Sequence, residues 1–131
     1  MTEQSGRKGF KQMLAEANAV IETIDVQHAL KLVNDPNVQF VDIRDGMELA
    51  QSGKVPGAVH ASRGLLEFVA DPESPMHKKE LSSGKRLVVY CASGGRSTLA
   101  TKTLMDMGHR NVCHIAGGFS AWNAAGGPVE K

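Results

Sequence analysis

Cys91 stands where a predicted strand gives way to a predicted helix. Residues 86–90 place four β-forming apolar residues in a row after an arginine, and the apolar spacing after Arg96 fits a helix. The N-terminus of a helix carries partial positive charge and stabilises anions. A thiol at that position has a lowered pKa and is largely thiolate near neutral pH. The pattern therefore predicts a nucleophilic sulfur at Cys91.

The loop after Cys91 is rich in groups that can hold an anion. Gly94 and Gly95 permit a positive φ and let the backbone approach a ligand closely, and Arg96 adds a fixed charge that can bind an oxyanion through two hydrogen bonds. Such a loop suits a group that is itself anionic once attached to sulfur, namely a persulfide, a phosphoryl group or an arsenyl group. The expected donors are the amides of Ala92, Ser93, Gly94, Gly95, Arg96 and Ser97. Ser97 also suits the N-cap of the following helix.

The cysteines and histidines leave other interpretations open. A buried structural thiol is the alternative for Cys91, but the glycines and the strand-to-helix setting favour a catalytic one. Cys113 lies in the middle of a predicted strand and is expected to be a passive core residue. No general base is visible beside Cys91, although five histidines leave a Cys/His pair open. The ligand spacing of a zinc site is missing, so no metal is expected.

Length and composition predict one ordinary globular domain. The chain has 131 residues, of which 41% are hydrophobic and 22% charged, and its formal net charge is +1. This charge favours neither nucleic acid nor a membrane surface as a partner. No apolar run approaches the length of a membrane span, and the first ten residues lack the apolar stretch of a secretory signal. We therefore expect a cytoplasmic protein.

Strands and helices alternate along the chain. This order predicts an α/β fold with a parallel sheet of about five strands and helices on both faces. Ligands of such sheets bind beyond the carboxyl ends of the strands, where Cys91 lies. The expected strands cover residues 20–24, 38–43, 58–60, 86–90 and 111–115. The expected helices cover residues 10–19, 26–33 (with Asp25 as N-cap), 48–51, 64–70, 76–82, 97–105 and 119–124.

Four segments together resemble the single-domain rhodanese family, over about residues 24–129. In order they are VDIRD (41–45), GKVPGAVH (53–60), CASGGRS (91–97), and GGFSAW (117–122) with GGP (126–128). The resemblance implies the three-layer rhodanese fold and a catalytic Cys91 that carries sulfane sulfur as a persulfide without a cofactor. It places the rhodanese-like domain at residues 21–131. Residues 1–20 then form an extension whose short helix could cover the sheet or mediate a homodimer.

Loop length within this resemblance separates two activities. Cys91 and Arg96 are spaced Cys-x4-Arg, as in the sulfurtransferases, whereas phosphatase and arsenate-reductase relatives have one residue more. Residues 60–68 are also similar to a stretch of the polysulfide-sulfurtransferase branch, although Ser62 replaces its usual proline. Polysulfide is dianionic, so Arg63 and Arg44 join Arg96 as candidate substrate-binding residues. For Arg44 a structural ion pair is the alternative.

The expected activity is transfer of sulfane sulfur from thiosulfate or polysulfide to a thiophilic acceptor, either a thiol or a carrier protein. A second hypothesis is a persulfide carrier or sulfide-responsive module that hands sulfur to one protein partner. A phosphatase-like Cys/Arg enzyme is disfavoured by loop length, and an inactive interaction domain is disfavoured by the presence of Cys91.

Overall fold

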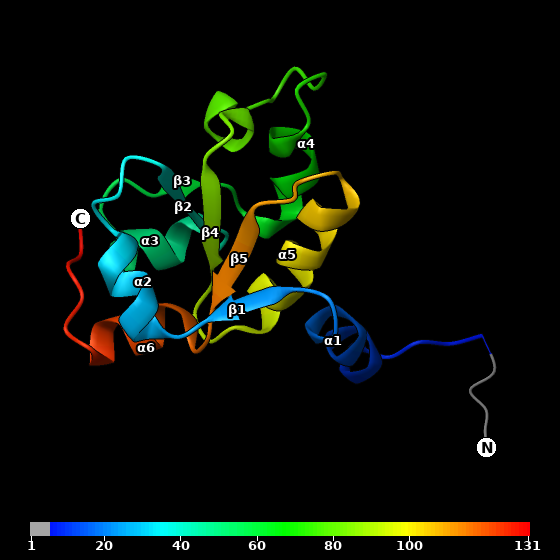
Figure 1. Ribbon diagram of the computed structural model, residues 1–131, viewed down its shortest axis with the longest axis horizontal. Coiled ribbons are helices and arrows are strands. Elements are labelled where there is room, and N and C mark those ends of the chain that lie inside the picture. The colour runs from blue at the N-terminus through cyan, green and yellow to red at the C-terminus, as the bar shows by residue number, and fades with distance from the viewer. Residues whose placement is uncertain (1–5) are drawn as a thin grey trace.

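A computed structural model describes residues 6–131 of the chain, and Figure 1 shows how its elements are arranged. Five parallel strands form one sheet in the order β1-β5-β4-β2-β3. The strands are β1 (Glu22–Ile24), β2 (Val38–Asp42), β3 (Val59–His60), β4 (Arg86–Tyr90) and β5 (Val112–Ile115). The predicted fold class and strand number are therefore confirmed.

Helices cover both faces of the sheet. The α-helices are α1 (Phe10–Asn18), α2 (Val26–Leu32), α3 (Gly46–Ser52), α4 (Leu66–Ala70), α5 (Gly95–Asp106) and α6 (Gly118–Ala124), and two short 3₁₀ helices are η1 (Arg63–Leu65) and η2 (Lys79–Ser82). Helices α4 and α5 lie on one side of the sheet and α2 and α6 on the other, as Figure 1 shows. The result is three layers, with β4 in the middle of the sheet.

The core divides into two apolar clusters because successive strand side chains point to opposite faces. On β4, Val89 packs with α4 and α5, while Val88 and Tyr90 pack with α2 and α6. Trp122 of α6 is fully buried in the second cluster, where its indole N–H donates to the carbonyl of Pro128. Trp122 is thus a core residue.

The N-terminal helix packs against the domain. Helix α1 matches the helix expected at residues 10–19 and lies along α5, with Ala17 buried. Residues 1–5 of the predicted extension lie outside the described residues, and the division of the chain at residue 20 stays a prediction. Within residues 6–131, none of the helices combines the length and the apolar character that a membrane crossing requires.

Several predicted helices differ from the structure. The helix expected at residues 48–51 covers Gly46–Ser52, and the one expected at residues 64–70 is divided into η1 and α4. The helix expected over residues 76–82 is reduced to η2, because Lys78 has an extended backbone and its N–H donates to the carbonyl of Val69. Helix α5 begins at Gly95, two residues before the predicted start. Gly94 precedes it with a left-handed φ of 118°, so Gly94, and not Ser97, occupies the N-cap.

Candidate active site

Cys91 follows β4 directly and lies at the N-terminal end of α5. Its side chain is 1% exposed. The Sγ atom accepts hydrogen bonds from the amide of Gly94 at 3.1 Å and from the amide of Ser97 at 3.3 Å, and it lies 3.6 Å from the Ser97 hydroxyl. Of the six amides expected to face the sulfur, those of Gly94 and Ser97 therefore donate to it.

These hydrogen bonds change the acidity of Cys91. Burial alone would raise the pKa of the thiol, but the hydroxyl and amide of Ser97, together with the amides of Gly94 and Ser93, lower it by more. The net pKa of Cys91 is below its ordinary value. The site thus favours an anionic sulfur despite being buried.

Helix α6 fixes the backbone on which Cys91 sits. The amide of Phe119 donates to the carbonyl of Cys91 at 2.8 Å, and the amide of Ser120 donates to the carbonyl of Ala92 at 3.0 Å. Gly118 makes this contact possible, because a Cβ there would lie 2.4 Å from the Cys91 carbonyl oxygen. The first turn of α6 therefore clamps the start of the Cys91 loop.

Replacement of Gly118 by alanine should distort the site. The new Cβ would meet backbone atoms, and a φ of +55° strains a non-glycine residue by about 1 kcal/mol or more. We expect a lower free energy of unfolding and a slower Cys91 alkylation, measured by denaturation and by iodoacetamide labelling. Gly57→Ala is the matched control, because Gly57 also has a positive φ but an added Cβ meets nothing. Equal effects of the two substitutions would contradict the clamp.

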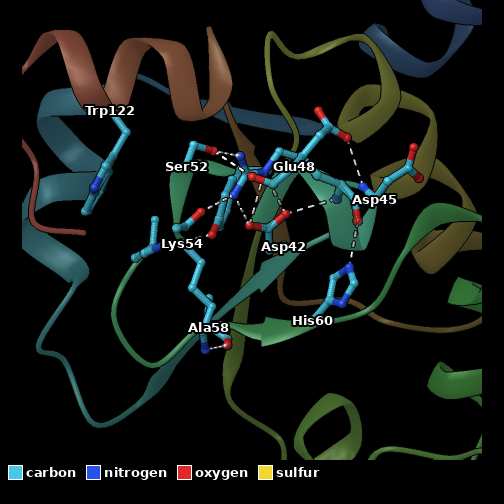
Figure 2. A network of polar contacts seen from close by, with 12 residues as sticks. Asp42, Asp45, Glu48, Ser52, Lys54, Ala58, His60 and Trp122 are labelled. Atoms are coloured by element: carbon cyan, nitrogen blue, oxygen red, sulfur yellow. Dashed lines mark hydrogen bonds and ion pairs between the residues drawn. The ribbon is translucent and has the colours of Figure 1, made fainter. Parts of the chain in front are cut away.

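Arg96 is held by a carboxylate from another element. Its guanidinium makes two hydrogen bonds to Glu48 of α3, at 2.8 and 3.0 Å. Glu48 also accepts from the amide of Asp45 at 2.9 Å, a contact drawn in Figure 2. The hydrogen bonds from Arg96 lower the pKa of Glu48 to about 2. Arg96 therefore stays in place through its pairing with Glu48.

The depressed pKa of Glu48 gives a pH prediction. Its ion pair contributes stability fully above about pH 4.5, the ordinary pKa, and loses it as the pH falls through about 2. The Arg96 side-chain NMR signal should therefore hold its position from pH 7 to 4.5 and move only at lower pH. In Glu48→Gln the same signal should sit at its unpaired position throughout. A transition near pH 4.5 in the native protein would contradict this pairing.

Arg44 is held by partners within the fold, although it also lines a pocket beside the Cys91 loop. Arg44 is 2% exposed as a residue, and its guanidinium pairs with buried Asp42 at 2.7 Å and also donates to the Ser52 hydroxyl and the Gly53 carbonyl. It stacks 4.1 Å from the centre of the Phe119 ring. Figure 2 shows the carboxylate of Asp42 at the centre of this network. The contacts of Arg44 are therefore those of the structural ion pair given above as the alternative, and its N–H donors bind groups of the protein itself.

Arg63 turns toward α4 and α5. Its guanidinium donates to Glu67 at 3.1 Å and to the Thr103 hydroxyl at 3.3 Å. Thr103 lies in the C-terminal half of α5, whereas Cys91 faces the N-terminal end of that helix. Arg96 thus lies near enough to Cys91 for their charges to interact, whereas the contacts of Arg63 direct it elsewhere.

Two residues near the site were not foreseen. His114 of β5 is buried and its Nδ1 lies 2.9 Å from the Ser97 hydroxyl, and Glu48 holds Arg96. A histidine inside an apolar strand could have drawn attention to His114. Its place near Cys91, however, depends on the sheet order, which puts β5 beside β4. No sequence pattern pairs Glu48 with Arg96, because the two are separated by 48 residues.

The second cysteine lies on the opposite face of the sheet. Cys113 packs in the cluster of α2 and α6, whereas Cys91 belongs to the cluster of α4 and α5. Burial raises the pKa of Cys113 to about 11. Its predicted role as a passive core residue is consistent with both observations.

A shallow pocket of about 300 Å³ opens beside the Cys91 loop. Ala92 of the loop, Glu48 of α3 and Ser120 of α6 contribute to its wall. A ligand in this pocket would touch the loop from the side that α3 and α6 frame.

Comparison with known proteins decides the family. A family model for the rhodanese-like domain matches residues 10–125. The chain belongs to the rhodanese-like family. It is similar to a sulfurtransferase of Allochromatium vinosum, with 33% identity over 99 residues that cover 76% of this chain and 84% of the relative.

Two solved structures place this rhodanese-like chain among its relatives. A protein of unknown function from Rhodopseudomonas palustris, described as a possible tyrosine phosphatase, is 47% identical with a TM-score of 0.91, and the match covers 99% of this chain and 100% of that one. The polysulfide-sulfur transferase homodimer of Wolinella succinogenes is 30% identical with a TM-score of 0.69, covering 92% of this chain and 86% of that one. The family model and the Allochromatium relative together place the chain in the rhodanese-like sulfurtransferase family.

Proposed function

We propose that this rhodanese-like protein transfers sulfane sulfur through a persulfide on Cys91. The observation that carries the proposal is the Sγ atom held by the amides of Gly94 and Ser97 at the start of α5. The first amides of a helix have no helical acceptor, so those of Gly95 and Arg96 remain available for a second sulfur. A persulfide anion is the attached group that such a loop fits.

The half-reactions balance with no cofactor. The Cys91 thiolate attacks the outer sulfur of thiosulfate, a sulfur–sulfur bond forms, and sulfite leaves with the electrons of the broken bond. With polysulfide the leaving group is a polysulfide dianion one sulfur shorter. An acceptor such as cyanide or a thiolate then attacks the outer sulfur of the persulfide, which restores the Cys91 thiolate.

Arg96 is the substrate-binding cation of this proposal, because Arg44 is paired with Asp42 and Arg63 is turned toward Thr103. Arg96 lies at the loop but shares its charge with Glu48, so its field on an incoming dianion is reduced. The Wolinella relative is named for polysulfide, which supports polysulfide as one of the two proposed donors beside thiosulfate. A homodimer, a cytoplasmic location and a thiol or carrier-protein acceptor stay predictions.

A second candidate is a phosphatase-like activity, because the Rhodopseudomonas relative is described as a possible tyrosine phosphatase. A turnover assay separates the two. Thiocyanate should form from cyanide with polysulfide and with thiosulfate, and an aryl phosphate should be hydrolysed no faster than in buffer. Rapid hydrolysis without thiocyanate formation would reverse the assignment. Slow thiocyanate formation with fast transfer to a protein thiol would favour a sulfur carrier.

A further inference from the structure

A buried chain of side chains runs from β1 through β5 to the sulfur of Cys91. Thr23 Oγ1 lies 3.0 Å from His114 Nε2, and His114 Nδ1 lies 2.9 Å from Ser97 Oγ. Ser97 Oγ is 3.6 Å from Cys91 Sγ. Ser97 is fully buried and His114 is 4% exposed, so water does not compete for these groups.

The number of hydrogens available fixes the direction of each hydrogen bond in this series of side chains. The Ser97 hydroxyl has one hydrogen and two lone pairs, and three groups lie within its reach. The carbonyl of Gly94 already accepts from the amide and the hydroxyl of Thr98, at 3.0 and 2.8 Å. The Ser97 hydroxyl also lies 3.1 Å from this carbonyl. Because the carbonyl has two donors from Thr98 already, it stays satisfied when the Ser97 hydrogen turns to the sulfur.

An ionised Cys91 can only accept a hydrogen bond, so it takes the Ser97 hydrogen. His114 must then donate from Nδ1 to Ser97 Oγ, because that oxygen has only lone pairs left. Nε2 of the neutral ring is then the acceptor and takes the Thr23 hydroxyl hydrogen. The tautomer of His114 with its proton on Nδ1 is therefore the one compatible with a Cys91 thiolate.

We propose that His114 is a positioning residue, whose Nδ1–H holds the Ser97 hydroxyl as a hydrogen-bond donor to the anionic sulfur of Cys91. The proposal deepens the function proposed above, and its tests read the thiol itself. Burial lowers the pKa of His114, which keeps the ring neutral and suits a donor rather than a charged base.

The groups around the two titrating residues are few. His114 faces hydroxyls, namely Thr23 from β1 and Ser97 from α5, with Val89 in register on β4. Near Cys91, Arg96 of α5 is a charged side chain whose charge interacts with the sulfur, while its guanidinium pairs with Glu48 of α3. The pH dependence of Cys91 reactivity thus reports on Arg96 and on the Ser97–His114 pair.

The pH profile of Cys91 alkylation by iodoacetamide, without any sulfur donor, tests the proposal. His114→Leu should raise the pKa of Cys91 by about one unit, which lowers the alkylation rate below that pKa about tenfold. His114→Asn, which keeps a nitrogen donor near the Nδ1 position, should recover most of the rate. His109→Leu is the matched control, since His109 lies beyond the opposite end of α5 and should leave the profile unchanged.

Two further measurements complete the test, namely the alkylation profile of a double variant and the tautomer of His114 in the native protein. Adding His114→Leu to Ser97→Ala should change the profile no further, and additive effects would overturn the proposal. If His114→Leu fails to fold, ¹⁵N NMR of the native protein decides. Nδ1-protonated His114 above the pKa of Cys91 is the expected state, and Nε2-protonated His114 would overturn the proposal. Loss of persulfide formation with an intact alkylation profile would instead reject the proposed function and leave His114 in its role.

Discussion

Serine in place of Cys91 is expected to abolish sulfur transfer. The hydroxyl of serine does not ionise near neutral pH and cannot hold sulfane sulfur as a persulfide, whereas the pKa of Cys91 is lowered by four hydrogen bonds from the loop. Loss of a covalent nucleophile lowers turnover by on the order of 10³-fold or more. Thiocyanate formation from polysulfide and cyanide measures this. The free energy of unfolding should change little, because oxygen replaces sulfur in the same cradle.

Cys113→Ser is the matched control for that substitution. Cys113 lies across the sheet from Cys91 in the other core cluster, and its raised pKa keeps it a thiol. Turnover per folded molecule should therefore match the native protein. Residual transfer by Cys91→Ser, or its loss in folded Cys113→Ser, would mean that sulfur moves through a different group.

The second large effect concerns stability. Arg44→Leu should lower the free energy of unfolding by about 3–5 kcal/mol, because it leaves the carboxylate of Asp42 buried without its partner. Asp42 is fully buried, and three guanidinium nitrogens of Arg44 donate to it, to Ser52 or to Gly53. Chemical denaturation measures the change.

Arg63→Leu supplies the comparison. Arg63 pairs with Glu67 at the surface, where such pairs contribute about 0–1 kcal/mol. The unfolding curve of the Arg63→Leu variant should therefore lie close to that of the native protein. If Arg44→Leu were as mild as Arg63→Leu but weakened donor binding, Arg44 would be a substrate residue after all.

The order of elements could be predicted because each carries a local signal. The apolar run of β4 and the turn at Gly94–Gly95 mark the place of Cys91, and Asp25 caps α2 through the amide of His28, as its type predicts. Parallel strands then put the loop at the carboxyl edge of the sheet. Position along the chain was therefore enough to place Cys91 at this edge, where the amides of Gly94 and Ser97 reach its sulfur.

The remaining features depend on contacts between distant segments. Arg96 meets Glu48 from α3, and Ser97 meets His114 from β5, which only the folded sheet brings together. For Arg44 the sequence left substrate binding and a structural ion pair both open, and only the folded end of β2 shows the guanidinium paired with Asp42. The start of α5 was misplaced because the left-handed Gly94 can cap a helix as well as a serine.

Intact-mass spectrometry after exposure to polysulfide or thiosulfate tests the central claim most directly, with Cys91→Ser and Cys113→Ser beside the native protein. The account predicts a gain of one sulfur atom in the native protein and in Cys113→Ser, its removal by cyanide, and no gain in Cys91→Ser. A folded native protein that gains no sulfur from either donor, or a Cys91→Ser variant that still gains it, would contradict the account.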